Sequence, residues 1–157
     1  MEPLDITIDT REQTPWHFEP HQANVRIGTL RTGDYALTGD TGFAIERKSL
    51  DDFLGTVSSG WERFQREIYR AKEAGFPSLP IIIEASLLQC LFHETEEGKI
   101  VGPDHEHPKL TPAFVTKRIA QLSLKGCSVV FAENAMYASA LAYAVLRERA
   151  VYLEGTE

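Results

Sequence analysis

The chain has 157 residues, of which 43% are hydrophobic and 25% are charged, and its formal net charge is −7. This length suits one domain over residues 1–157 with a sizeable core, and no apolar stretch is long enough to cross a membrane. The start has neither the basic region nor the apolar run of a signal peptide, and two cysteines do not make a disulfide framework. We therefore expect an intracellular protein, in the cytoplasm or nucleoid, with no membrane partner.

The acidic surplus is unevenly distributed. Residues 25–72 hold eight basic and seven acidic residues, a balance of +1, whereas the rest of the chain holds eight basic and sixteen acidic residues. A net charge of −7 disfavours binding to a polyanion, because nucleic-acid binding relies on cationic side chains. The near-neutral region 25–72 remains compatible with such a partner, and bound metal ions would make it more positive.

The first predicted strand is Leu4–Asp9, in which apolar and polar residues alternate. It ends at Asp9 and is followed at once by Arg11 and Glu12. The strand therefore delivers two carboxylates and a guanidinium group to one place in the fold.

Residues 43–47 read as a strand that is entered from a Gly-Asp-Thr-Gly turn, and the segment 25–37 precedes this turn. Side chains two apart on a strand share a face, so Glu46 and Lys48 should point the same way. Asp34 lies near the end of the preceding segment, and a hairpin folded at the turn brings it beside Glu46. The sequence thus predicts a divalent-metal pocket next to a lysine.

Hard oxygen ligands of this kind suit Mg²⁺, which usually takes one or two protein carboxylates together with waters and phosphate oxygens. Lys48 could orient or deprotonate the attacking water, or neutralise charge that builds up in the transition state. The pattern predicts metal-dependent hydrolysis of phosphodiester bonds. Each motif alone is also common in ordinary turns and strands, so the prediction depends on their combination.

The combined motifs resemble those of the XPF-type structure-specific endonucleases, the ERCC4-domain family. The signature of that family is Gly-Asp, a variable spacer, Glu-Arg-Lys, three residues and Asp. Here it reads Gly33-Asp34, Glu46-Arg47-Lys48 and Asp52. The upstream Asp-x-Arg-Glu element of the family is similar to Asp9-Thr10-Arg11-Glu12, and the likeness extends over residues 5–67, the nuclease domain alone.

This resemblance implies an α/β fold with a restriction-endonuclease-like core, in which a mixed central sheet is flanked by helices. It implies that Asp34 and Glu46 are ligands of Mg²⁺ or Mn²⁺ and that Lys48 lies beside the scissile phosphate. It also implies that Asp9 is a further acidic group of the catalytic and metal site. Glu12 follows as an additional candidate metal ligand.

Three charged positions near these motifs are less clearly assigned. Arg47 should point to the opposite face of its strand, where it could form a buried ion pair or contact phosphate. Asp52 follows a predicted helix start at Ser49, so it could support the helix dipole or act in the site. Many members of the family have glutamine where this chain has Glu67, and the resemblance therefore gives Glu67 no role.

Residues 61–74 predict an amphipathic helix. Its apolar face is formed by Trp61, Phe64, Ile68 and Ala71. A nearly opposite stripe holds Arg63, Arg66 and Arg70. This stripe could bind DNA phosphates, as could Arg11 and Arg47, or it could be a solvated face paired with neighbouring glutamates.

The apolar run 79–83 predicts a buried central strand. It is closed by Glu84, which could border the active site or simply end the strand. Residues 93–108 are then expected to form a flexible, acidic surface loop. Its three histidines invite a zinc site, but their spacing matches no tight structural-zinc pattern.

A helix should begin at Thr111-Pro112, with a capping threonine and a proline in its first turn, and end near Gly126. Residues 128–132 predict a strand, and Asn134 should cap a last helix that runs to about Arg149. That helix is apolar nearly all round, so it could pack against the sheet or face a second copy of the chain. The resembled family pairs through late helices, which implies a homodimer.

We therefore expect a Mg²⁺- or Mn²⁺-dependent DNA endonuclease that cuts branched or flapped DNA, in repair or recombination, and leaves 5′-phosphate and 3′-hydroxyl ends. The alternatives are an exonuclease or sequence-directed endonuclease of the same superfamily, and a catalytically silent DNA-binding partner subunit. The sequence has neither the tandem helix-hairpin-helix module of many cellular members nor a helicase segment, which leaves the preferred DNA structure open. Its size is typical of a minimal nuclease of bacterial, viral or mobile-element origin.

Overall fold

The computed structural model describes residues 1–103 and 109–155. Its strands are β1 (Leu4–Asp9), β2 (Ala23–Gly28), β3 (Tyr35–Leu37), β4 (Glu46–Lys48), β5 (Leu79–Ile83), β6 (His93–Glu94), β7 (Ile100–Val101) and β8 (Cys127–Phe131). Its helices are α1 (Leu50–Val57), α2 (Trp61–Glu73), α3 (Leu87–Leu91), α4 (Pro112–Leu124) and α5 (Ala135–Glu154). Within the described ranges, no helix is long and apolar enough to cross a membrane.

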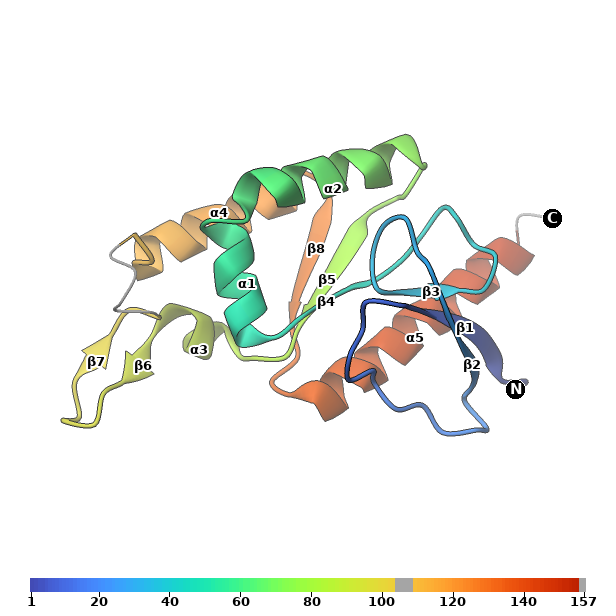
Figure 1. Cartoon of the computed structure of the whole chain (residues 1–157), viewed down its shortest axis with the longest axis horizontal. Helices are drawn as coiled ribbons and strands as arrows, with labels where there is room; N and C mark the ends of the chain where they lie inside the picture. The colour runs from blue at the N-terminus through green and yellow to red at the C-terminus, as the bar shows by residue number, and fades with distance from the viewer. Residues whose placement is uncertain (104–108, 156–157) are drawn as a thin grey trace.

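Two three-stranded sheets are joined into one mixed layer (Figure 1). In one sheet β1 lies between β2, which runs parallel to it, and the antiparallel β3. In the other sheet β5 lies between β4 and β8, and both pairings are parallel. An antiparallel bridge between Tyr35 and Ile45 joins the two sheets, with N···O distances of 3.2 and 2.8 Å. The predicted α/β fold with a mixed sheet flanked by helices is confirmed.

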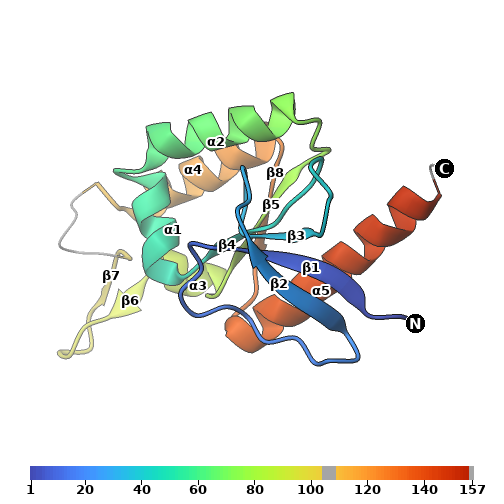
Figure 2. The ribbon, with the colours of Figure 1, turned by 45° about the vertical axis from the view of Figure 1, so that its right-hand side comes forward.

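Helices cover both faces of this layer (Figures 1 and 2). The helices α1, α2 and α4 lie on one face, and α5 runs along the other, against β3 and β5. Strand β5 contributes to both cores: Ile81 and Ile83 pack with residues of α1, α2 and α4, whereas Ile82 packs with residues of α5. All five residues of β5 are buried, as predicted for a central strand whose side chains alternate between two covered faces.

Capping side chains start the helices where the sequence predicts. Ser49, Thr111 and Asn134 accept hydrogen bonds from backbone N–H groups three residues later, at 3.1, 3.1 and 2.9 Å. Helix α5 continues past its predicted end at Arg149 to Glu154. It packs against the sheet through a stripe of small and apolar side chains. The buried residues of this stripe are Ala138, Ala142 and Leu146.

Within residues 25–37, the segment that precedes the turn, a bend separates β2 from β3. Two local features interrupt the run. The Leu30 N–H donates to the Asp9 carboxylate at 2.8 Å, and Gly33 adopts a left-handed φ of 81°. As a result β2 pairs with β1 in parallel, and only the short β3 remains to form the hairpin.

The turn predicted at residues 39–42 is present and leads the chain back toward β3. The strand predicted over residues 43–47 is shifted along the sequence. Of these residues, Ile45 makes the bridge to Tyr35, and β4 then begins at Glu46 to pair with β5.

The acidic segment predicted as a flexible loop over residues 93–108 contains regular structure. Strands β6 and β7 form a short antiparallel hairpin in this part of the segment. The hairpin is closed by the Thr95 N–H, which donates to the Lys99 carbonyl oxygen at 2.8 Å. The remaining acidic and histidine positions, residues 104–108, lie outside the described residues.

The structure gives Gly33 two reasons to be glycine, and Gly39 only one. Both have a left-handed φ, but a Cβ on Gly33 would lie 2.6 Å from the Cβ of Ala44, whereas a Cβ on Gly39 would meet nothing within 4 Å. We expect Gly39→Ala to lower the free energy of unfolding by about 1 kcal/mol, the cost of the left-handed conformation. Gly33→Ala should cost roughly 1–3 kcal/mol more, because of the overlap. Urea denaturation of the two variants measures the difference, and equal losses would contradict this packing.

Candidate active site

The corner before β3 places the first predicted metal ligand. The Asp34 N–H donates to the Ile45 carbonyl oxygen at 2.8 Å, directly beside the bridge that joins the two sheets. The Asp34 side chain accepts, through Oδ2, a hydrogen bond of 2.8 Å from the backbone N–H of Arg47. Asp34 is thereby held against β4, as the hairpin prediction required.

Strand β4 carries the second predicted ligand and the lysine on one face. The Lys48 Nζ lies 3.0 Å from Glu46 Oε1, and the two side chains are 15% and 7% exposed. The ammonium group also lies 5.5 Å from the centre of the Phe64 ring in α2. The alternation of a strand therefore brings Glu46 and Lys48 together under α2, with Asp34 at the edge of β4.

The two carboxylates of this corner have unusual acidities. Burial, with the nearby Asp34 charge as the next contribution, raises the pKa of Glu46 to about 8, and the Lys48 ammonium only partly offsets it. Burial also raises the pKa of Asp34 to about 6, against the hydrogen bond from the Arg47 N–H. Burial opposes the charged form of Lys48, but the adjacent carboxylates outweigh it and raise the pKa of this ammonium group. The pocket therefore holds more acidic groups than its one lysine neutralises.

This donor set fits a hard divalent cation. Asp34 and Glu46 offer carboxylate oxygens, and the raised pKa of each means that a cation would relieve an unfavourable concentration of negative charge. Mg²⁺ needs one or two protein carboxylates and otherwise takes water and phosphate oxygens. In the described part of the chain, no three His, Cys, Asp or Glu side chains are grouped as around a metal ion. The arrangement therefore fits a two-carboxylate site and not a closed cage of protein ligands.

Asp9, predicted as a third acidic group, lies beside Asp34, because its N–H donates to the Asp34 carbonyl oxygen at 2.9 Å. Its buried carboxylate accepts hydrogen bonds from Arg11 Nε at 2.6 Å, from the Arg11 N–H at 3.1 Å and from the Leu30 N–H at 2.8 Å. Burial opposes ionisation, but these hydrogen bonds outweigh it and lower the pKa of Asp9. The carboxylate is thus ionised and satisfied by the protein, and the structure gives it a role in holding the turn after β1.

Arg47 points to the face of β4 opposite Glu46, as the strand alternation predicted. Its guanidinium donates to Glu84 through Nε at 2.6 Å and to Glu12 through Nη1 at 3.0 Å. It also lies 5.0 Å from the centre of the Trp16 ring. Of the two roles considered for Arg47, a buried ion pair or a phosphate contact, the structure contains the ion pair. The predicted metal ligand Glu12 lies in this ion-pair network, and its charge also contributes to raising the pKa of Asp34.

Sequence reasoning missed two aromatic members of this network. The Tyr35 hydroxyl donates to Glu12 Oε2 at 2.8 Å and accepts a hydrogen bond from the backbone N–H of Trp16 at 2.8 Å. The rings of Tyr35 and Trp16 stack with their centres 4.5 Å apart. The Trp16 indole N–H donates to Glu84 at 2.6 Å. The sequence gives no signal that the polar ends of Tyr35 and Trp16 reach the two carboxylates that pair with Arg47.

The remaining predicted residues lie at the border of the site or outside it. Arg63 and Arg66 are exposed on α2, Arg70 is half-buried there, and the Arg11 side chain is 69% exposed next to Asp9. Asp52 is exposed in the first turn of α1, where its N–H donates to the Ser49 hydroxyl and its charge lies at the positive end of the helix.

A residue to which the sequence gave no role does reach the corner. The carboxylate of Glu67, on α2, accepts a hydrogen bond of 3.4 Å from the Gly33 N–H. Its charge also contributes to raising the pKa of Asp34 and of Glu46. The helical position facing β3 could not be read from the sequence, because it depends on how α2 packs over the sheet.

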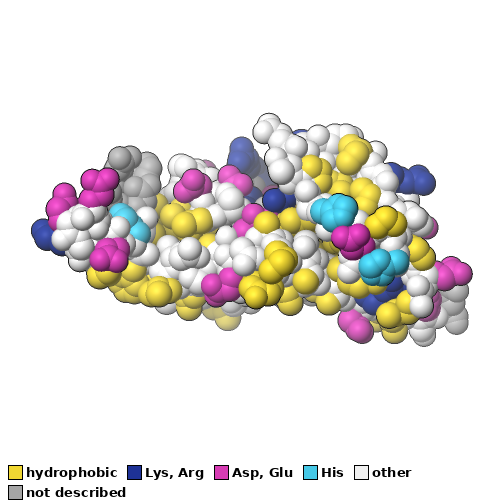
Figure 3. Space-filling model, turned by 90° about the horizontal axis from the view of Figure 1, so that it is seen from below, with side chains coloured by type: hydrophobic (Ala, Val, Ile, Leu, Met, Phe, Trp, Pro, Cys, Tyr) yellow, Lys and Arg dark blue, Asp and Glu magenta, His cyan; other side chains and the backbone are white. Residues whose placement is uncertain are grey.

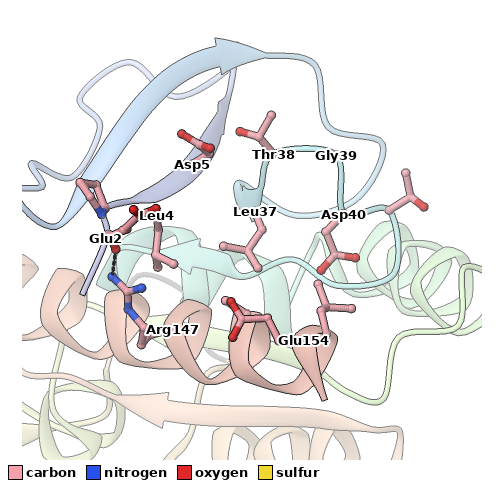
Figure 4. A pocket seen from close by; sticks show the side chains of 13 residues that line it. Glu2, Leu4, Asp5, Leu37, Thr38, Gly39, Asp40, Arg147 and Glu154 are labelled. Atoms are coloured by element: carbon pink, nitrogen blue, oxygen red, sulfur yellow. Dashed lines mark hydrogen bonds between the residues drawn. The ribbon is translucent and has the colours of Figure 1, made fainter. Parts of the chain in front are cut away.

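A separate groove of about 630 Å³ lies between the start of β1, the turn after β3 and the end of α5 (Figure 4). Its charged lining is mostly acidic. The acidic residues are Glu2, Asp5, Asp40 and Glu154. Arg147 also lines it and donates to the Glu2 carbonyl oxygen at 2.9 Å. This charge makes the groove unsuitable for a phosphate backbone.

The raised pKa of Glu46 gives a prediction for stability without metal. The unfolded chain loses this proton near the ordinary pKa of 4.5, whereas the folded chain keeps it until about pH 8. The contribution of Glu46 to the free energy of unfolding is therefore most favourable at low pH, and it is lost as the pH rises from 4.5 to about 8. The glutamine of Glu46→Gln cannot ionise. In the presence of a chelator, the free energy of unfolding of this variant should therefore exceed that of the wild type by about 1 kcal/mol or more at pH 8.

Thermal and urea unfolding across this pH range test the expectation. The advantage of Glu46→Gln should shrink as the pH falls toward 4.5 and vanish below it, where the wild-type side chain is protonated in both states. Glu62→Gln, at an exposed position of α2, is the matched control and should not change the pH profile. A glutamine variant that is less stable than the wild type at pH 8 would contradict the burial of an uncompensated acid.

The Arg47 network gives a second prediction for stability. Arg47→Ala leaves Glu12 and Glu84 without their cation, so it should lower the free energy of unfolding by about 3 kcal/mol. Arg66→Ala removes an exposed arginine and should change it by less than about 0.5 kcal/mol. Urea denaturation of both variants measures the difference. Similar stabilities of the two variants would mean that the network does not hold β4.

Comparison with known proteins places this site in a family context. The sequence model of the ERCC4 domain matches residues 8–145. Over 100 residues the chain is 27% identical to the protein named "Putative ATP-dependent RNA helicase MJ1505" from Methanocaldococcus jannaschii. This match covers 64% of the chain but 12% of that protein, so the chain spans a small part of its length.

Two solved structures have a similar fold. XPF from Aeropyrum pernix matches with a TM-score of 0.65 and 18% identity, over 97% of this chain and 68% of that chain. The same protein in complex with DNA matches with a TM-score of 0.64 and 20% identity, over 95% of this chain and 66% of that chain. At these identities the likeness shows the fold. Since the family match spans residues 8–145 and includes the Gly-Asp and Glu-Arg-Lys motifs, the chain belongs to the ERCC4 domain family.

Proposed function

We propose that this domain is a divalent-metal-dependent DNA endonuclease that hydrolyses phosphodiester bonds. The observation that carries the proposal is the convergence of Asp34, Glu46 and Lys48 at one partly buried corner, although eleven residues of chain lie between the first two. Family membership and a fold shared with XPF support the same conclusion. A fold alone would not, because function depends on the site.

The residues of the corner suggest a division of labour. Asp34 and Glu46 would hold Mg²⁺ or Mn²⁺, which, when bound, polarises the phosphate and supplies an activated water. Neighbouring carboxylates raise the pKa of Lys48, so this side chain is cationic at neutral pH. Of the two roles open to it, stabilising negative charge on the transferring phosphate is therefore favoured over removing a proton from water.

Binding of DNA would draw on cationic side chains around this corner. Arg63 and Arg66 are exposed on α2, and Arg11 lies beside the buried Asp9. Arg47 is already committed to two carboxylates, so it supports β4 and is not needed as a phosphate contact. Phosphate contacts of this kind bind DNA without reading its sequence, which suits an enzyme that recognises DNA shape.

Branched or flapped DNA is the proposed substrate, in repair or recombination, with 5′-phosphate and 3′-hydroxyl products. One of the similar solved structures is a complex with DNA, which supports a nucleic-acid partner for this chain. A homodimer through α5 would provide a second binding surface. Exposed apolar side chains on α5, such as Met136, Tyr137 and Leu141, favour such pairing. In the view of Figure 3, hydrophobic side chains follow one long edge of the molecule and are not confined to one end.

Cleavage of labelled DNA tests the proposal directly. Asp34→Ala and Lys48→Ala should each lower the rate with Mg²⁺ or Mn²⁺ by roughly 10²-fold or more, because each removes charge stabilisation at the scissile phosphate. Asp51→Ala and Lys117→Ala, which remove exposed charges on α1 and α4, are the matched controls and should cleave like the wild type. Normal activity of Asp34→Ala would overturn the site assignment.

The substrate panel distinguishes the alternative functions. It contains a flap, a splayed fork, a linear duplex, a single strand and a covalently closed circle. Incision near a branch indicates a structure-specific endonuclease, and failure to cut the closed circle together with trimming from ends indicates an exonuclease. A chain that binds these DNAs but takes up no Mn²⁺ in calorimetry is a silent DNA-binding subunit.

A further inference from the structure

We infer that Glu67 is a third acidic residue of the metal site, one that acts through its charge and through water and does not coordinate the cation directly. The inference rests on the metal-dependent function proposed above. Glu67 lies on α2, whereas the two proposed metal ligands lie at the corner before β3 and on β4. Three observations carry it: the position of Glu67 on the helix, its contact with Gly33, and the charges that surround it.

The geometry of α2 directs Glu67 at the catalytic corner. Phe64 and Ala71, three residues before and four after, are buried against the sheet. Arg63 and Arg70 lie one turn away on the solvent side of Glu67, so this side chain stands at the boundary between the core and the arginine stripe. Figure 2 shows the chain that precedes β3 rising toward α2 at this place.

The contact with Gly33 places the carboxylate next to the corner. Glu67 Oε1 accepts the Gly33 N–H at 3.4 Å, and Gly33 immediately precedes Asp34. Within the described residues, no donor is hydrogen-bonded to the second oxygen, Oε2. One oxygen thus anchors the side chain to the corner, and the other can accept a hydrogen bond from water.

The charges around Glu67 include more carboxylates than the buried cation of the protein compensates. Asp34, Glu46 and Glu67 share one buried ammonium group, that of Lys48. The charge of Glu67 contributes to raising the pKa of Asp34, of Glu46 and of Lys48. Arg11 also interacts with Glu67, but it is mostly exposed and is bonded to Asp9. The excess of carboxylates suits a doubly charged ion.

Direct coordination is not supported for Glu67. In the part of the chain that the structure describes, no three acidic, histidine or cysteine side chains are grouped as metal ligands. Mg²⁺ and Mn²⁺ sites with two protein carboxylates retain water, and groups that bind those waters affect metal affinity. Glu67 therefore fits as the acceptor for such a water and as a source of attractive charge.

A purely structural role is the alternative, in which Glu67 only accepts the Gly33 N–H. Glutamine has the same shape and the same carbonyl acceptor, so Glu67→Gln keeps the hydrogen bond and removes the charge. Alanine removes both. The two variants therefore separate the electrostatic role from the structural one.

Calorimetric titration with Mn²⁺ at neutral pH, in the absence of DNA, tests the inference. We expect Glu67→Gln and Glu67→Ala each to weaken Mn²⁺ binding by roughly tenfold or more, as is typical for a residue that supports metal ligands. The thermal stabilisation of the chain by Mn²⁺ should fall in parallel. Glu62→Gln removes an exposed carboxylate from the same helix and should bind Mn²⁺ like the wild type.

The outcomes separate this inference from the proposed function. Wild-type affinity in Glu67→Gln, with or without a loss in Glu67→Ala, would leave the metal site intact and overturn the role of the Glu67 charge. No Mn²⁺ binding by the wild-type chain would overturn the metal-dependent function and this inference together. Because the glutamine variant keeps the contact with Gly33, its result stands even where the alanine variant fails to fold.

Discussion

The antiparallel bridge between Tyr35 and Ile45 is the contact on which the site depends. It joins the two three-stranded sheets, and the residues that flank it are Asp34 and Glu46. The two carboxylates therefore lie side by side only because the sheets are joined here. Gly33 makes the corner possible, since its left-handed backbone and missing Cβ let the chain pass close to the opposite strand.

The charged side chains on the two faces of β4 differ in how well the protein compensates them. On one face, Glu46 is buried with one lysine and a second carboxylate nearby, and the protein does not compensate its ionisation. On the other face, Arg47 has partners in Glu12 and Glu84 and stacks near an indole ring. The first face suits the binding of a cation at some cost in stability, and the second holds the strand in place.

Helix α2 links the fold to the proposed chemistry. Its apolar side packs on the sheet and places Phe64 next to the Lys48 ammonium. Its solvent side carries arginines suited to a phosphate backbone, and Glu67 stands between these two sides. One amphipathic helix can thus supply packing, cationic contacts for DNA and negative charge for a metal, because each function uses a different angular sector of the helix.

The sequence by itself determined the elements with strong local signals and the residue pairs that lie close along the chain. Alternation predicted β1 and the shared face of Glu46 and Lys48, capping residues predicted the helix starts, and the motif spacing predicted the family. The bend between β2 and β3, the commitment of Asp9 and Glu12 to arginines, and the approach of Glu67 were decided by tertiary structure. Most of these features depend on contacts between segments distant in sequence, such as Glu12 with Arg47 and Glu67 with Gly33. The pair of Asp9 with Arg11 is close along the chain but depends on the conformation of the turn after β1. Local periodicity carries no information about either kind of partner.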